Sequence, residues 1–153
     1  TPLLLGLALL AQLPAAAQNA EADNMRILRE KMMGDKKLIV AANMALTDAE
    51  SKAFWPIYDA YQAELQKINE QLGTIIADYA RMHNAGKLTD ARARALMDRY
   101  LGAEEAEVRL KRTFAKRLDK VLPGVKVTRY LQIENKIRAI VKYELAGEVP
   151  LAK

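Results

Sequence analysis

The clearest pattern in the sequence is a row of nine apolar residues, spaced alternately four and three positions apart. The row comprises Phe54, Tyr58, Tyr61, Leu65, Ile68, Leu72, Ile75, Tyr79 and Met82. This period of about 3.5 residues predicts one long helix whose apolar side packs against another helix, as in a coiled coil. We expect the helix to begin at Thr47, because Thr47 and Glu50 have the spacing of a capping box. Pro56 lies inside the pattern and predicts a kink near the helix start.

Turn signals divide the rest of the chain into three further helical segments. We expect the first over residues 23–44, a third that Thr89 caps and that extends to Val121, and a fourth from about Thr128 to Gly147. The apolar row of the third segment is less regular, and consists of Leu96, Tyr100, Ala103, Glu107, Leu110, Phe114 and Val121. No stretch of useful length alternates between apolar and polar residues, so the sequence predicts an all-α fold.

The helix lengths predict an elongated shape. At about 1.5 Å per residue, the second and third segments would be roughly 55 and 48 Å long. We therefore expect an elongated antiparallel helical hairpin with two shorter flanking helices. Such a thin layer buries little apolar surface by itself, so a homodimer is the simplest way to stabilise it.

The N-terminus has the pattern of an export signal. Residues 3–13 form an uncharged apolar run, which Pro14 and three alanines at 15–17 follow. This order is typical of a secretory signal peptide, so we expect residues 1–17 to be a signal remnant and residues 18–153 one all-helical domain. The apolar run is too short for a stable membrane span. Export predicts a periplasmic location; the alternative is a retained apolar helix that packs on a partner.

Composition excludes several classes of chemistry. The 153 residues include no Cys and a single His, His83. Disulfides, thiol nucleophiles and multi-histidine metal sites are therefore excluded within one subunit. We find no phosphate-binding loop or nucleophile motif. Glu104 and Glu107 are three positions apart, but basic neighbours favour a charged helix surface over acid–base catalysis. We expect no enzyme, no cofactor and no metal, and the intermixed acidic residues argue against nucleic-acid binding.

The net charge of +5 is unevenly distributed. Residues 21–80 carry 7 basic and 10 acidic side chains, whereas residues 81–153 carry 17 and 9. Within the basic part, helical geometry places four side chains on one stripe away from the apolar row: Arg109, Arg112, Lys116 and Lys120. This stripe is either a solvated back face or a surface that attracts acidic unfolded chains.

Trp55, like the basic stripe, has a structural and a functional interpretation. It lies between Phe54 and Tyr58, beside Pro56 and off the main apolar row. Its side chain either packs in the core or forms an exposed apolar contact for an unfolded client protein. Our candidate binding residues are therefore Phe54, Trp55 and Tyr58 together with the basic stripe.

A weak repeat marks the helix starts. Leu46-Thr47 is followed by Glu50 and Phe54, Leu88-Thr89 by Arg92 and Leu96, and Leu122-Pro123 by Lys126 and Tyr130. Repeated helix capping alone accounts for this pattern.

An exported, cysteine-free, all-helical chain with repeated Leu-Thr helix starts also resembles the Spy/CpxP periplasmic chaperone family, whose mark is the LTxxQ motif. The resemblance covers residues 25–145. Glu50 and Arg92 stand where the family prefers Gln, and Pro123 replaces the third Thr. The resemblance implies a curved dimeric cradle that binds unfolded clients without ATP through a basic and apolar surface.

Two functional hypotheses follow. The first is an exported chaperone-like protein of the envelope stress response that holds unfolded or partly folded clients. The second is a structural or regulatory subunit that docks one specific folded envelope partner.

Overall fold

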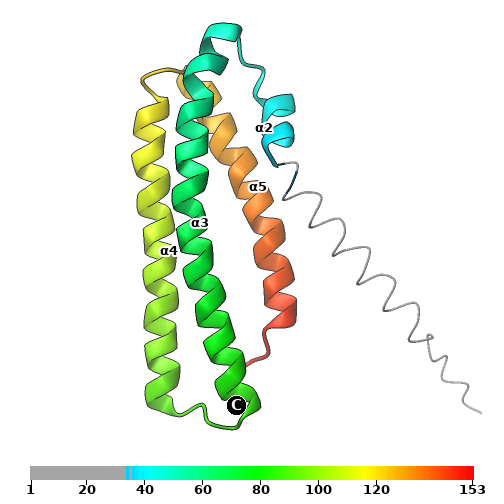
Figure 1. Cartoon of the computed structure of the whole chain (residues 1–153), viewed down its shortest axis with the longest axis vertical. Helices are drawn as coiled ribbons and strands as arrows, with labels where there is room; N and C mark the ends of the chain where they lie inside the picture. Colours follow the sequence, from blue (N-terminus) through cyan, green and yellow to red (C-terminus); the bar gives the residue numbers. More distant parts are fainter. Residues whose placement is uncertain (1–33, 35) are drawn as a thin grey trace, which may run out of the picture. The chain divides into compact units, whose positions relative to one another are not determined.

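The computed structural model describes residue 34 and residues 36–153. That part of the chain contains helices α2 (Lys36–Met44), α3 (Asp48–Asn84), α4 (Asp90–Leu118) and α5 (Gly124–Glu148), and no strand (Figure 1). The all-α prediction is confirmed. The expected signal segment and most of the predicted first helix lie outside the described residues. Residues 40–153 form one compact unit, which contains α3, α4, α5 and the second half of α2.

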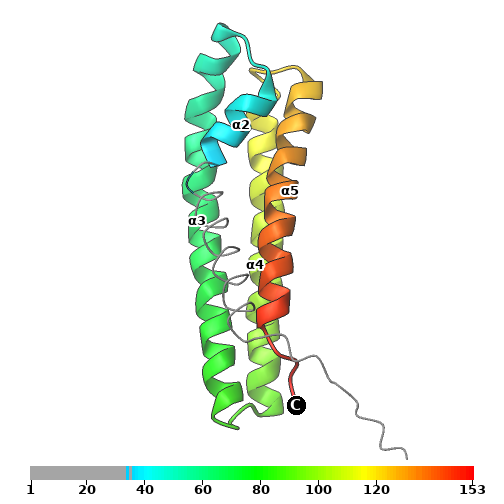
Figure 2. The ribbon, with the colours of Figure 1, turned by 90° about the vertical axis from the view of Figure 1, so that its right-hand side faces the viewer.

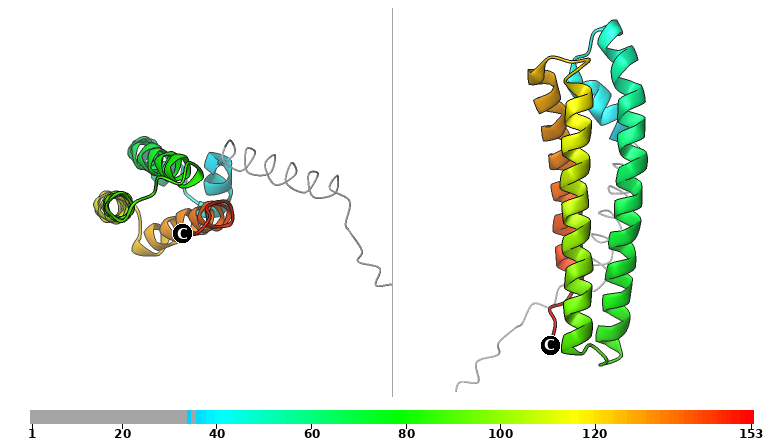
Figure 3. Two further views of the ribbon diagram at one scale, coloured as in Figure 1. Left: turned by 90° about the horizontal axis from the view of Figure 1, so that it is seen from below. Right: turned by 90° about the vertical axis from the view of Figure 1, so that its left-hand side faces the viewer.

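Three long helices lie side by side in this unit. α3 and α4 form the predicted antiparallel hairpin, and α5 returns next to them in the direction of α3 (Figures 1 and 2). Seen end-on, α3, α4 and α5 occupy the corners of a triangle (Figure 3). α5 is shorter than the hairpin helices but extends along most of their length.

The long helix begins where the sequence predicts and ends at Asn84. The Glu50 amide donates to Thr47 Oγ1 at 3.3 Å, and the Thr47 amide donates to Glu50 Oε2 at 2.8 Å, which confirms the capping box. After Asn84 the chain turns through Gly86, whose φ of 63° lies in the left-handed region that favours glycine. In the apolar row, the seven residues from Phe54 to Ile75 are buried, and Tyr79 and Met82 are half-buried.

The boundary between α4 and α5 differs from the prediction. α4 ends at Leu118 rather than Val121, and α5 begins at Gly124 rather than near Thr128. The backbone of Pro123 is extended, and its carbonyl accepts hydrogen bonds from the amides of Lys126 and Val127. Gly124 is therefore the first residue of the next helix.

The two ends of the three-helix unit are packed differently. We call the end that contains the start of α3, the end of α4 and the start of α5 the closed end. Its core consists of Val40, Met44, Phe54, Tyr58, Tyr61, Leu65, Phe114, Leu118, Leu122, Val127 and Tyr130. We call the other end, with the α3–α4 turn and the end of α5, the open end. A smaller buried cluster of Ile68, Leu72 and Ala103 lies between the two ends.

Candidate functional site

The aromatic candidates belong mainly to the core. Phe54 and Tyr58 are buried, and the Phe54 ring meets the Tyr130 ring of α5 edge-on at 5.2 Å. The prediction of a contact surface at these two residues is therefore corrected: their places in the apolar row point them toward α5. Trp55 is half-buried against the same core, and its Nε1 donates to Ser51 Oγ at 2.9 Å. Burial raises the pKa of the Tyr58 phenol to about 12, which the nearby Glu134 carboxylate reinforces.

The basic stripe lies on the surface. Arg109, Arg112, Lys116 and Lys120 are all exposed. Arg109 Nη1 lies 3.3 Å from Glu105 Oε2, in an ion pair that solvent screens. Between residues 109 and 120 the chain carries six basic side chains and one acidic one. This part of α4 and the turn after it thus presents excess positive charge to water.

An exposed apolar row continues the basic stripe along the same helix. Met97, Leu101 and Val108 are 54%, 50% and 50% exposed. Spacings of four and seven residues keep them on one side of α4, and Arg112 and Lys116 follow at further spacings of four. We call these five residues, Met97, Leu101, Val108, Arg112 and Lys116, the α4 face. It is apolar toward the open end and basic toward the closed end.

The helix-start motifs have structural roles at both ends. Lys126 Nζ donates to Glu50 Oε2 at 2.5 Å and to the Ala45 carbonyl at 2.9 Å, so the first and third copies of the repeat bind each other at the closed end. The hydrogen bond from Lys126 holds the pKa of Glu50 below its usual value. Leu46 and Leu122, which begin these copies, pack in the closed-end core.

The second copy lies alone at the open end. Thr89 Oγ1 accepts a hydrogen bond from the Arg92 amide at 3.4 Å. The Arg92 guanidinium donates from Nη1 to the Lys87 carbonyl at 2.9 Å and stays within the turn. Leu88 lines a cleft described below. Thr47, Glu50 and Thr89 therefore cap helices, as the sequence predicts, whereas Pro123 makes no side-chain cap bond.

Buried polar groups join the three helices near their middle. Glu107, expected on a charged surface, is only 3% exposed. Its carboxylate forms ion pairs with Lys111 Nζ at 2.8 Å and with Arg138 Nη2 at 2.5 Å. Arg138 Nη1 also donates to Asn69 Oδ1 of α3 at 2.6 Å. Burial disfavours the Glu107 anion, but the two cations outweigh burial and hold its pKa below the usual value. The surface assignment of Glu107 is thus corrected.

A second buried carboxylate extends this layer toward the closed end. Glu134, also 3% exposed, accepts a hydrogen bond from Gln62 Nε2 at 2.8 Å, and Gln62 Nε2 lies 3.3 Å from Tyr130 Oη. Burial of the Tyr130 phenol, together with the nearby Glu134 carboxylate, raises the pKa of that phenol. These polar contacts set the register of α5 against α3 and α4.

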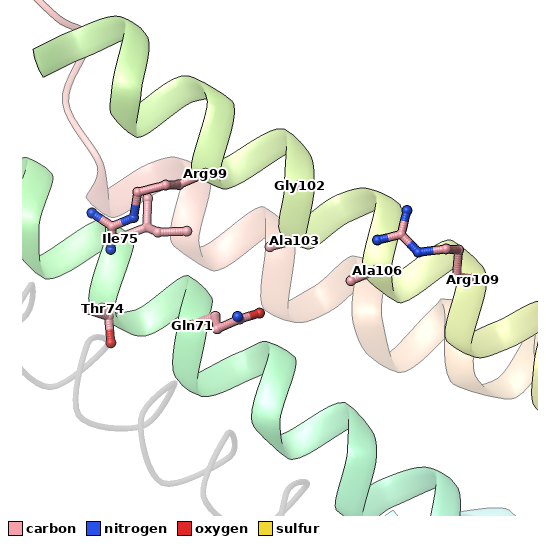
Figure 4. Close-up of a pocket in the computed structure, with 8 residues that line it drawn as sticks. All are labelled: Gln71, Thr74, Ile75, Arg99, Gly102, Ala103, Ala106 and Arg109. Atoms are coloured by element: carbon pink, nitrogen blue, oxygen red, sulfur yellow. The ribbon is translucent and has the colours of Figure 1, made fainter.

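A shallow hollow lies between α3 and α4. Its volume is about 470 Å³, with Gly102, Ala103 and Ala106 among its lining residues (Figure 4). Arg99 and Arg109 also line it. Arg99 Nη1 binds Asp78 at 2.8 Å, which holds the pKa of that carboxylate below its usual value. Because Arg109 also has a carboxylate partner, this hollow offers mostly small side chains and satisfied charges.

A larger and more apolar cleft opens at the open end. Its volume is about 670 Å³, and its walls come from α3, α4, α5 and the extended segment at residues 149–152. Ile76, Leu96, Tyr100, Leu145 and Leu151 are among the apolar residues that line it. The Tyr79 hydroxyl donates to the Pro150 carbonyl at 2.7 Å and ties that segment to α3. No pattern in the sequence predicts this cleft, because its lining comes from helices that are far apart in the chain.

Two negative findings apply to the part of the chain that the structure describes. No three His, Cys, Asp or Glu side chains there come together as a metal site. None of the described helices is both long enough and apolar enough to cross a membrane.

Comparison of the chain with protein-family models, with curated proteins and with solved structures found no match.

Proposed function

We propose that the protein is an exported, ATP-independent chaperone-like binding protein that holds unfolded or partly folded clients on the α4 face. The observation that carries this proposal is the row of exposed apolar and basic side chains on one side of α4, which Glu105 interrupts between Leu101 and Val108. Arg112 and Lys116 make no ion pair or hydrogen bond with any described residue, so their charges are free to act on a partner.

The two halves of the α4 face have separate roles. Positive charge raises the encounter rate with acidic chains over a distance of about 10 Å at moderate salt. Contact with the apolar half then removes Met97, Leu101 and Val108 from water. Full burial of one such side chain is worth roughly 1.5–3 kcal/mol, so three half-exposed residues support weak, reversible binding.

The resemblance to the Spy/CpxP family supports the same proposal, because that family binds clients on basic and apolar helical surfaces. It also motivates a homodimer, in which two α4 faces would line one cradle. Sedimentation at micromolar concentration tests this part: a strictly monomeric species would remove the cradle but leave the α4 face.

The decisive experiment measures light scattering of a chemically denatured client in the presence of the protein. We expect near-stoichiometric suppression of aggregation without ATP. The double variants Leu101→Ser/Val108→Ser and Arg112→Glu/Lys116→Glu should each weaken suppression several-fold. Both pairs are exposed, so the variants should fold normally.

A matched control is available on α5. Arg129 and Lys136 are exposed, and Arg129→Glu/Lys136→Glu makes the same change of charge away from the α4 face. We expect that control to suppress aggregation as well as the natural sequence does. If the natural sequence leaves scattering unchanged at every ratio, the chaperone proposal fails.

The alternative is a subunit that docks one folded envelope partner. One observation favours this alternative. The ion pair between Glu107 and Arg138 holds α4 and α5 in a fixed register, and a rigid α4 face suits a partner of fixed shape. A pull-down from the native envelope separates the two functions. Many unrelated clients support the chaperone, whereas a single dominant protein lost in Leu101→Ser/Val108→Ser supports the alternative.

A further inference from the structure

The open-end cleft has the properties of a ligand site. Its volume of about 670 Å³ falls within the roughly 300–1,000 Å³ of pockets that hold small organic molecules. The lining is apolar apart from Arg94, Lys142 and the polar atoms of tyrosines and backbone. Leu96 and Ile75 at its base are almost fully buried, so the cleft reaches the core between the helices.

Small side chains explain why the cleft is not filled by the protein itself. Ala93 of α4 and Ala146 and Ala152 at the end of the chain line it, where the closed end has tyrosines and phenylalanines. Since the polar layer at Glu107 and Arg138 fixes α5, that helix cannot slide inward to close the space. An apolar ligand in the cleft would remove exposed surface of Met97, Tyr100 and Leu151 from water.

The shape favours a slender ligand over a folded protein. The walls come from three helices and the segment at residues 149–152, and the lining includes Leu96 and Ile75, which are almost fully buried. A slender alkyl chain can reach such buried positions more easily than the surface of a folded protein can.

The charges of the lining favour one anionic group on the ligand. Lys142 Nζ is already paired with both Glu104 oxygens at 3.0 Å. Arg94 has no ion pair or hydrogen bond with any described residue. Arg94 is thus the lining cation without an ion pair among the described residues, although Asp90 and Asp98 lie one turn away on either side of it along α4, and a carboxylate matches its guanidinium in charge and in bidentate geometry.

We propose that the open-end cleft binds a long-chain alkyl carboxylate, with its chain between α3, α4 and α5 and its carboxylate at Arg94. Met97 belongs both to the α4 face and to the lining of the cleft, whereas the other proposed client contacts, Leu101, Val108, Arg112 and Lys116, do not line it.

Titration calorimetry with palmitate below its micelle concentration tests the proposal, with hexadecyltrimethylammonium as a probe of equal chain length and opposite charge. We expect palmitate to bind at one site and the cationic probe to bind at least tenfold more weakly. Equal affinity for both probes would overturn the assignment of the anionic group.

Three variants in the lining and one control outside it locate the site. Ala146→Trp places a large ring in the cleft and should raise the Kd for palmitate at least tenfold; Ala139→Trp makes the same change at an exposed position of α5 that does not line the cleft and should leave the Kd unchanged. If Ala146→Trp does not fold, Ala93→Phe fills the cleft from α4. Arg94→Gln should raise the Kd about two- to fivefold, as expected for an exposed ion pair.

Failure of the ligand proposal can be told apart from failure of the chaperone proposal, because different variants affect each. Ala146→Trp should still suppress client aggregation, and Leu101→Ser/Val108→Ser should still bind palmitate. Palmitate binding that survives both cleft-filling variants places the ligand elsewhere and overturns the inference. Loss of aggregation suppression in Ala146→Trp would show instead that the cleft receives apolar segments of clients.

Discussion

The closed and open ends are built from the same three helices, but only the closed end is filled. Both phenylalanines and the single tryptophan lie at the closed end with Tyr58, Tyr61 and Tyr130. Their rings meet at centroid distances of 5.0–6.1 Å, mostly edge-on. The other three tyrosines lie elsewhere, where Tyr79 is half-buried, Tyr100 is 42% exposed and Tyr143 is 83% exposed. Side-chain volume, rather than helix geometry, distinguishes a core from a cleft in this fold.

The two ends also differ in how their helices are joined. At the closed end, Lys126 connects α5 to Glu50 and to the Ala45 carbonyl. At the open end, the end of α5 is held by the exposed Lys142–Glu104 pair and by the hydrogen bond from Tyr79 to Pro150. Exposed contacts of this kind contribute little to stability, so we expect the open end to undergo local opening more readily.

Core truncation gives the largest expected difference between the ends. Phe54→Ala removes a ring that is fully buried at the closed end and should lower the free energy of unfolding by about 3–5 kcal/mol. Tyr100→Ala removes a ring of similar size at the open end, where it is 42% exposed, and should cost about 1 kcal/mol or less. Denaturant unfolding followed by circular dichroism measures both. Equal losses would show that the two ends are packed alike.

The buried ion pair between the ends gives the next largest effect. Glu107→Gln leaves Arg138 buried without its charge partner and should lower the free energy of unfolding by about 1.5–3 kcal/mol. Because the folded-state pKa of Glu107 is lowered, its contribution is present above the ordinary value of 4.5 and is lost as pH falls through the folded-state pKa. The stability difference between the natural sequence and Glu107→Gln should therefore shrink on acidification from pH 7 to pH 3.

A double variant is the control for this prediction. Glu107→Leu/Arg138→Met replaces both charges with apolar side chains of similar size and should recover most of the lost stability. If the double variant is as unstable as Glu107→Gln, the loss comes from packing rather than from an unpaired charge.

Periodicity and capping chemistry were sufficient to predict the hairpin but not the position of α5. The row from Phe54 to Ile75 and the cap at Thr47 are local patterns, and both were found correctly. α5 begins at Gly124, four residues before the predicted start, because a Pro-Gly pair can stand after the end of one helix or at the start of the next. Whether the pair stops a helix or starts one depends on where the following residues pack, and Val127 and Tyr130 pack in the closed-end core.

The candidate site could be predicted only in part for a related reason. The basic stripe followed from spacing on one helix, and the structure places Arg112, Lys116 and Lys120 on the surface. The cleft requires knowing which residues of α4 face α5, and the burial of Glu107 requires knowing that Arg138 lies opposite. Contacts between helices far apart in the sequence leave no local pattern in a single chain.

Helix capping gives the smallest difference between the ends. Thr47 has both bonds of a capping box, whereas Thr89 accepts a single longer bond from the Arg92 amide. Thr47→Ala should therefore lower the free energy of unfolding by about 1 kcal/mol, and Thr89→Ala by about half of that. Thr47→Ser and Thr89→Ser keep the hydroxyl, so each should be almost as stable as the natural sequence. Comparison of the Ser and Ala variants separates the effect of the capping hydroxyl from that of the threonine methyl group. A larger loss at Thr89 than at Thr47 would mean that the open-end turn contributes more to the stability of the fold than its contacts indicate.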